Sequence, residues 1–121
     1  MYKVLIIEDN QTMREAMQEI LHLEGHTVDV ATDGEEGLQK FREFKPDLTL
    51  CDVKLGKING MDVLKEIMKY DSNATVILIT AFESVELAVN AMKSGAADFI
   101  PKPFSPDQLR SKVLEFGKKS V

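Results

Sequence analysis

The sequence predicts an α/β fold in which five parallel strands form one doubly wound sheet and five helices cover it. Short apolar runs alternate along the chain with longer segments whose apolar residues recur at helical spacing. The first, third and fourth runs are apolar, which is typical of strands covered on both faces, so we expect them at the centre of the sheet. Such alternation requires right-handed crossovers. The strand order 2-1-3-4-5, with two helices on one face and three on the other, meets these conditions.

The expected strands are the runs Val4–Ile7, Thr27–Ala31, Leu48–Cys51, Val76–Ile79 and Asp98–Ile100. In the second run, Asp29 alternates with apolar neighbours, and the fifth run is short. Both features suit the edges of the sheet, because an edge strand is only partly covered.

The first three helices are predicted from apolar residues that recur on one face. The first helix has them at positions 13, 16, 17, 20 and 21, and Gly25 ends it. The second turns Leu38, Phe41 and Phe44 inward and stops before Pro46. The third follows a loop from residue 52 to residue 60 and has its apolar residues at 63, 64, 67 and 68.

The last two helices are predicted from spacing and from their end signals. The fourth is expected to turn inward Val85, Ala88, Val89 and Met92, and Gly95 closes it. The fifth begins at Pro106 after the capping residue Ser105, with Gln108 three positions further on, which is a capping-box pattern. Its inward residues are Leu109, Val113 and Phe116.

Composition excludes several classes of protein. The 121 residues make one domain, and 15 basic against 20 acidic residues give a net charge of −5, which disfavours binding to nucleic acid or to an anionic bilayer. The single Cys51 allows no internal disulfide and reads as a small buried hydrophobe, and His22 and His26 are expected at the surface. The apolar runs are too short to cross a membrane, and no signal peptide opens the chain. We therefore expect a cytoplasmic domain.

Polar residues gather where the strands end. The first strand is followed by Glu8 and Asp9, the third by Asp52, the fourth by Thr80 and the fifth by Lys102. Each residue alone has an ordinary explanation, such as a helix cap or a solvated side chain. Because the carboxyl ends of parallel strands share one rim, where ligands bind in such sheets, the set together predicts a site.

The chemistry of that site follows from its charges. Two carboxylates about 4 Å apart repel each other by roughly 4 kcal/mol at an effective dielectric of 20. Three of them therefore require a cation, and oxygen ligands suit Mg2+, for which Mn2+ can substitute. A metal-bound acidic pocket favours a phosphoryl group, whose oxygens Lys102 and Thr80 would hold. Asp52, at the middle strand, is the expected nucleophile.

In this order, the residues at the strand ends resemble the receiver domains of two-component response regulators. The resemblance covers the whole chain and depends on five features: Glu8-Asp9, Asp52, Gly60 eight residues later, Thr80-Ala81 and Lys102-Pro103. Each motif is weak alone, but the ordered set is specific. The segment from residue 80 to residue 104 is similar to NtrC-like transcriptional activators.

The resemblance implies the flavodoxin-like, or CheY-like, form of the fold and a single receiver domain over residues 1–121. It implies that Asp52 accepts a phosphoryl group from a phosphohistidine on a sensor histidine kinase. It also implies that Mg2+ is bound by Glu8, Asp9, Asp52 and the backbone carbonyl of Lys54. The chain would then be a phosphoacceptor and not an enzyme, promoting only its own phosphotransfer and dephosphorylation.

Further residue roles are implied in the same way. Lys102 would contact the acyl phosphate, Thr80 would move toward it, and Phe99, at the aromatic switch position, would turn inward. Family members commonly have a cis bond where Lys102-Pro103 lies. Two positions near the site vary in the family, and here they are Lys54 and Phe82; Gly56 stands where a proline is common.

The implied output is a change at the face formed by the fourth helix, the fifth strand and the fifth helix. That face would control transcription through the chain's own effector domain or act on a downstream protein, and phosphorylation could bring two copies together. A stand-alone phosphorelay intermediate and a phosphorylation-independent binding module remain alternatives. A magnesium-dependent phosphatase would need a substrate pocket that nothing in the sequence suggests. A flavin-binding module would need a phosphate-binding loop where Glu8 and Asp9 lie.

Overall fold

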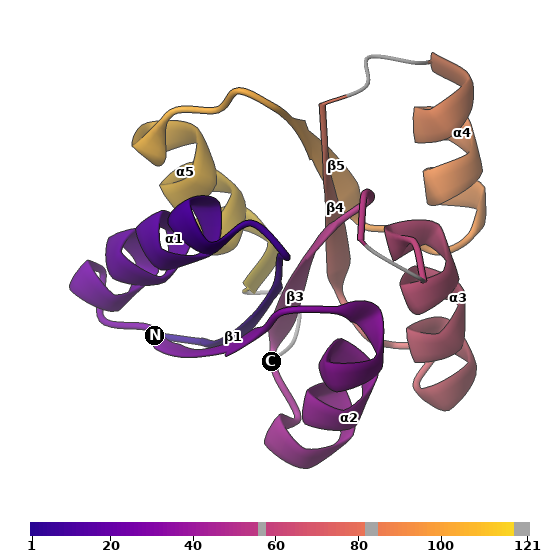
Figure 1. The fold of residues 1–121 in the computed structure, drawn as a ribbon, viewed down its shortest axis with the longest axis horizontal. Coiled ribbons are helices and arrows are strands. Elements are labelled where there is room, and N and C mark those ends of the chain that lie inside the picture. The colour runs from indigo at the N-terminus through magenta and orange to yellow at the C-terminus, as the bar shows by residue number, and fades with distance from the viewer. Residues whose placement is uncertain (56–57, 82–84, 118–121) are drawn as a thin grey trace.

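The computed structural model describes residues 1–55, 58–81 and 85–117. Its strands and helices alternate, as Figure 1 shows. The strands are β1 (Lys3–Ile7), β2 (Thr27–Ala31), β3 (Leu48–Asp52), β4 (Val76–Thr80) and β5 (Asp98–Pro101). The helices are α1 (Gln11–Leu23), α2 (Gly34–Phe44), α3 (Gly60–Tyr70), α4 (Val85–Lys93) and α5 (Pro106–Gly117).

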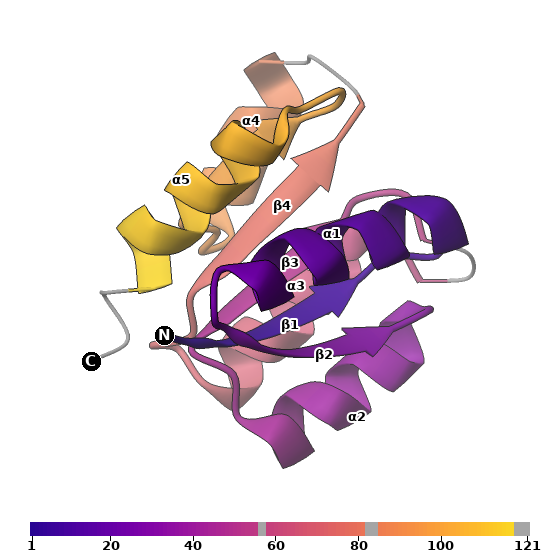
Figure 2. The same cartoon turned by 90° about the vertical axis from the view of Figure 1, so that its left-hand side faces the viewer.

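The five strands form one parallel sheet in the order β2-β1-β3-β4-β5, which confirms the predicted topology. Two helices, α1 and α5, pack on one face of the sheet, and α2, α3 and α4 pack on the other (Figures 1 and 2). Successive strand residues point to opposite faces. Leu5 and Ile7 therefore join the core under α2 and α3, while Val4 and Ile6 join the core under α1 and α5.

The predicted end signals are present in the structure. Asn10 caps α1 with a side-chain oxygen that accepts from the amide of Met13. Gly25, just after that helix, has a φ of 89°, in the left-handed region that favours glycine. At α5, Ser105 and Gln108 exchange the two hydrogen bonds of a capping box. The Lys102-Pro103 peptide is cis, as the resemblance implied.

The predicted inward face of α4 is wrong for Val89 and Met92. Among the described side chains of α4, Ala91 is the buried one, whereas Val89 and Met92 are 43% and 48% exposed. Ala88 is half-buried, and the side chain of Val85 lies outside the described part. Because α4 carries apolar residues on more than one face, periodicity alone does not identify the face that packs on the sheet.

His26 also departs from the prediction, because it is buried and not at the surface. Its Nδ1 accepts a hydrogen bond from the Tyr2 amide at 3.1 Å, and its ring stacks on the Tyr2 ring with centroids 5.4 Å apart. Burial lowers the pKa of His26, with the nearby N-terminal amino group acting in the same direction. His22 is exposed, as expected.

The lowered pKa of His26 predicts a loss of stability in acid. Because the unfolded chain binds the proton first, stability is complete above the ordinary histidine pKa and falls as the pH drops below it. We expect wild type to lose more free energy of unfolding between pH 7.5 and pH 5.5 than His26→Asn, whose side-chain oxygen takes the place of Nδ1 as acceptor for the Tyr2 amide. Urea unfolding at both pH values measures this. Equal losses in the two proteins would contradict the prediction.

Thr49 offers a second stability test. It lies in β3 between Leu5 of β1 and Val76 of β4, and it is fully buried. Within the described ranges, its Oγ1 has no hydrogen-bond partner. Thr49→Val keeps the shape and removes this unsatisfied hydroxyl, so we expect a gain of about 1 kcal/mol in the free energy of unfolding. Thr27→Val, at an exposed position of β2, is the control, and thermal unfolding should separate the two variants by about 3 °C.

Candidate functional site

The candidate site lies at the carboxyl edge of the sheet, where four strands end. Asp52 and Thr80 are the last residues of β3 and β4, Glu8 follows β1, and Lys102 follows β5. Glu8, Asp52 and Thr80 are buried, at 1%, 5% and 4% exposure. Parallel pairing of β1, β3, β4 and β5 therefore brings together residues that are far apart in the sequence.

Lys102 joins the two buried carboxylates. Its Nζ lies 3.0 Å from Oε1 of Glu8 and 3.1 Å from Oδ2 of Asp52. The second oxygen of Asp52 accepts from the amide of Lys54 at 3.2 Å, and the second oxygen of Glu8 accepts from the amide of Asn10 at the same distance. Asp52 thus points into the site from the end of a central strand.

Burial and crowding disfavour negative charge at Glu8. Burial, reinforced by Asp52, raises the pKa of Glu8 to about 7, although the hydrogen bond from Lys102 opposes this rise. For Lys102, burial would lower the pKa, but the hydrogen bonds to Glu8 and Asp52 outweigh burial and raise it. The ammonium of Lys102 therefore stays charged. Its single positive charge does not fully offset the two carboxylates.

Asp9 completes an acidic cluster with Glu8 and Asp52. One carboxylate oxygen from each of the three residues lies within 4.8 Å of the others, and Asp9 is the exposed member. Hard oxygen donors at this spacing fit a cation such as Mg2+. The carboxylates predicted from the sequence are therefore close enough to share one ion.

Thr80 and Phe99 lie together beside this cluster. Both line a small pocket between β4, β5 and α4 that also includes Leu78, Ala88 and Ala91. Thr80 is buried and Phe99 is half-buried against the core under α3 and α4. The predicted switch residues are thus neighbours, and an inward movement of the Phe99 ring would require this pocket to widen.

Other sequence-based expectations have mixed outcomes. Cys51 is fully buried, as predicted, and burial raises the pKa of its thiol. Lys54 is exposed, and its amide donates to a carboxylate oxygen of Asp52. Phe82, at a family-variable position, and Gly56, where a proline is common, lie outside the described residues.

Sequence reasoning missed Arg14. Its Nη1 donates to the carbonyl oxygens of Glu8 and Asp9, at 2.9 and 3.3 Å. Helical side chains lean toward the N-terminus of their helix, so an arginine one turn after the cap residue Asn10 points back over the acidic loop. That spacing is a signal in the sequence which could have identified it.

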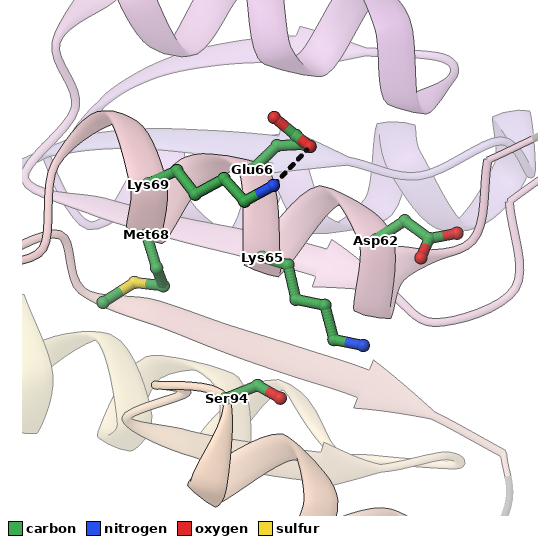
Figure 3. Close-up of a pocket in the computed structure, with 6 residues that line it drawn as sticks. All are labelled: Asp62, Lys65, Glu66, Met68, Lys69 and Ser94. Atoms are coloured by element: carbon green, nitrogen blue, oxygen red, sulfur yellow. Dashed lines mark ion pairs between the residues drawn. The ribbon is translucent and has the colours of Figure 1, made fainter.

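A separate open pocket lies along α3 and does not contain the acidic cluster (Figure 3). Its lining residues are Asp62, Lys65, Glu66, Met68, Lys69 and Ser94. Within it, Lys69 pairs with Glu66 at 3.5 Å. This mixed-charge surface offers no group that could act on the carboxylates at the strand ends.

The fold and the site define a doubly wound α/β domain with an acidic cluster, which fits a cation, beside a half-buried lysine. The profile of the response regulator receiver domain family matches residues 4–114, and the chain belongs to that family. Receiver domains are the phosphorylation-activated switches of two-component systems, and binding of Mg2+ is typical of them.

Three relatives show the range of this family. The chain is 40% identical to the chemotaxis protein CheY of Thermotoga maritima, over 96% of this chain and 98% of that protein. It is 36% identical to the transcriptional regulatory protein ZraR of Klebsiella oxytoca, over 93% of this chain but 25% of that protein. The solved CheX-CheY-BeF3-Mg2+ complex of Borrelia burgdorferi has a TM-score of 0.90 and 31% identity, over 94% of this chain and 87% of that chain.

These relatives support the predicted similarity to NtrC-like activators, because ZraR is among them. They also show that the chain spans nearly all of the CheY relative and about a quarter of ZraR. In the described residues, no helix has the length and apolarity needed to cross a membrane.

Proposed function

We propose that Asp52 is the phosphoacceptor of this receiver domain, which extends over residues 1–121. The observation that carries the proposal is the contact of the Lys102 ammonium with both Asp52 and Glu8 at the end of a central strand. This contact supports the proposal because a carboxylate oxygen of Asp52 lies next to the positive charge of Lys102, where a phosphoryl group would bring its negative oxygens.

The proposed step is a phosphoryl transfer. An oxygen of Asp52 attacks the phosphorus of a phosphohistidine on a sensor kinase, the P–N bond breaks, and the histidine leaves and takes up a proton. Lys102 stays beside the new acyl phosphate and offsets its charge. The hydroxyl of Thr80, at the end of the neighbouring strand, donates to a phosphoryl oxygen when it moves toward the site. Hydrolysis of the acyl phosphate later returns Asp52 to its carboxylate.

Glu8, Asp9, Asp52 and the carbonyl of Lys54 would hold Mg2+ for this step. The clustered carboxylates support this fit, and burial together with Asp52 raises the pKa of Glu8, so a bound cation would stabilise the charged form of Glu8. When bound, the ion neutralises charge on the transferring phosphoryl oxygens. Mn2+ can substitute because it prefers the same ligands.

The phosphorylated state is read, in this proposal, on the face of α4, β5 and α5. Val89 and Met92 are exposed on α4, and Thr80 and Phe99 line the pocket under the same helix. A movement of Thr80 and Phe99 would therefore reposition apolar surface that a partner can contact. The partners would be an effector domain, a downstream protein or a second copy of the chain, in the cytoplasm and without direct contact with nucleic acid.

Intact mass after incubation with acetyl phosphate and Mg2+ tests the acceptor. Wild type should gain one phosphoryl group, and Asp52→Asn should gain none, because an amide does not form the acyl phosphate. Asp62→Asn, an exposed acid in the first turn of α3, is the matched control and should react like wild type. Chelation of Mg2+ beforehand should prevent the adduct.

Two results would contradict the assignment. An adduct on Asp52→Asn would place the acceptor elsewhere. An unmodified wild type, with no stabilisation by beryllium fluoride and Mg2+ as a phosphoryl mimic, would leave a phosphorylation-independent binding module. Repeated turnover of a small phosphorylated substrate would instead indicate a phosphatase.

A further inference from the structure

Arg14 bonds to the main chain that carries two of the acidic residues. One guanidinium nitrogen, Nη1, donates to the carbonyl of Glu8 at 2.9 Å and to the carbonyl of Asp9 at 3.3 Å. The Arg14 amide donates in turn to the carbonyl of Asn10 within the first turn of α1. The side chain therefore links the acidic loop to the body of the helix.

Glu8 is held by several other contacts. Its amide donates to the carbonyl of Ala31 in β2, and its two carboxylate oxygens accept from Lys102 and from the amide of Asn10. The side chain is also buried, at 1% exposure, which further restricts its movement. The position of Glu8 therefore does not depend on Arg14 alone.

Asp9 is different. It is exposed, and in the part of the chain that the structure describes its carboxylate has no hydrogen bond or ion pair. Over the same residues, the bond from Arg14 is the one hydrogen bond to its carbonyl. The backbone of Asp9 sets the direction in which its side chain leaves the main chain, and Arg14 is the side chain that restrains that backbone.

We propose that Arg14 is a positioning residue that holds Asp9 in place for the cation, and this inference rests on the proposed function of the acidic cluster. Two effects of Arg14 on Mg2+ affinity have opposite signs. Its positive charge repels the ion, so loss of the charge alone would strengthen binding. Its hydrogen bonds preorganise the ligand loop, so their loss weakens binding, typically about tenfold for a residue that orients a metal ligand.

Binding of Mg2+ alone, followed by amide NMR titration, separates the two effects. The amides of Asn10 and Lys54, which contact Glu8 and Asp52, report on the site. We expect the dissociation constant for Mg2+ to rise about tenfold in Arg14→Met. Arg42→Met, which removes the same charge from an exposed position on α2, is the control and should bind Mg2+ as wild type does.

A second variant covers the case in which Arg14→Met does not fold. Arg14→Lys keeps the charge, but its shorter side chain cannot hold both carbonyls in the same way, so its affinity should also fall, and by less than in Arg14→Met. The amide spectrum of each variant without Mg2+ shows whether the fold is intact.

The outcomes distinguish this inference from the function on which it rests. If wild type shows no Mg2+ binding, the proposed cation site itself is wrong. If wild type binds Mg2+ and a folded Arg14→Met binds it equally well or more tightly, only the positioning role is wrong. If only Arg14→Lys folds, an affinity equal to that of wild type overturns the positioning role.

Discussion

Gly60→Ala is expected to destabilise the domain by about 2–4 kcal/mol, which corresponds to a fall of roughly 10 °C in the melting temperature. A Cβ at this position would lie 2.2 Å from the carbonyl oxygen of Asp52 and 2.7 Å from Cα of Val53. Both atoms belong to the backbone, so no side-chain rotation can relieve the clash. The amide of Gly60 also donates to the carbonyl of Val53 at 2.7 Å, which holds the two segments together.

The same substitution should also slow phosphorylation, because the atoms in its way belong to the turn that carries Asp52. Gly34→Ala is the matched control, since Gly34 is likewise the first residue of its helix. There a Cβ would meet Cγ2 of Val63 at 2.9 Å, a methyl group that can rotate away, and Cβ of Ile58 at 3.2 Å, which is a milder contact. Thermal unfolding and the rate of phosphoryl gain from acetyl phosphate measure both effects. Equal losses in the two variants would show that the close backbone approach is not responsible.

Lys102→Met is expected to cost about 2–3 kcal/mol of stability at pH 8 in the absence of Mg2+. This cost is somewhat less than that of removing one member of a fully buried ion pair, because Lys102 is partly exposed. The variant leaves Glu8 and Asp52 adjacent and buried without the ammonium that lies 3.0 and 3.1 Å from them. Mg2+ should restore more stability to this variant than to wild type, because the ion would supply the missing charge.

The pH dependence of this variant has a defined sign. In wild type, the hydrogen bond from Lys102 opposes the rise of the Glu8 pKa to about 7, so its loss raises that pKa further. A carboxyl group whose pKa is raised by folding destabilises the protein above that pKa and not below the unfolded value. The deficit of Lys102→Met should therefore shrink between pH 8 and pH 6.

Lys40→Met is the control for the charge change. Lys40 also contacts two acids, Asp29 at 3.3 Å and Glu36 at 4.0 Å, but these are more than a third exposed. We expect a loss below about 1 kcal/mol and no response to Mg2+. Urea unfolding of both variants at the two pH values, with EDTA or with Mg2+, measures the difference. If Lys102→Met behaved like Lys40→Met, the buried carboxylates would not depend on the ammonium.

The sequence patterns that predicted the strands were reliable because strands covered on both faces need continuous apolar runs. The run Val4–Ile7 became β1 with one added residue, and Leu48–Cys51 became β3 by extending to Asp52. The topology then determined which strand ends meet. Glu8, Asp52 and Lys102 were identified because a parallel sheet brings the carboxyl ends of its strands to one edge.

Other features depend on packing that local patterns do not encode. The orientation of α4 is set by contact with the sheet. Because the helix has apolar residues on more than one face, periodicity could not predict which face packs on the sheet. The burial of His26 involves the approach of Tyr2, which lies just before β1 and 24 residues away along the chain. Arg14 contacts the main-chain carbonyls of Glu8 and Asp9. The direction of these carbonyls depends on the conformation of the loop between β1 and α1, which local sequence patterns do not encode.

The bond between Glu8 and Lys102 joins residues 94 positions apart in the chain. During synthesis, the chain therefore contains the acids of the site long before it contains Lys102, which is the first residue after β5. Contacts of such long range form late in folding, since closing the chain across them costs entropy before they stabilise anything. Competence for phosphorylation is thus expected only after β5 has emerged from the ribosome and joined the sheet, so a partly synthesised chain cannot receive the signal.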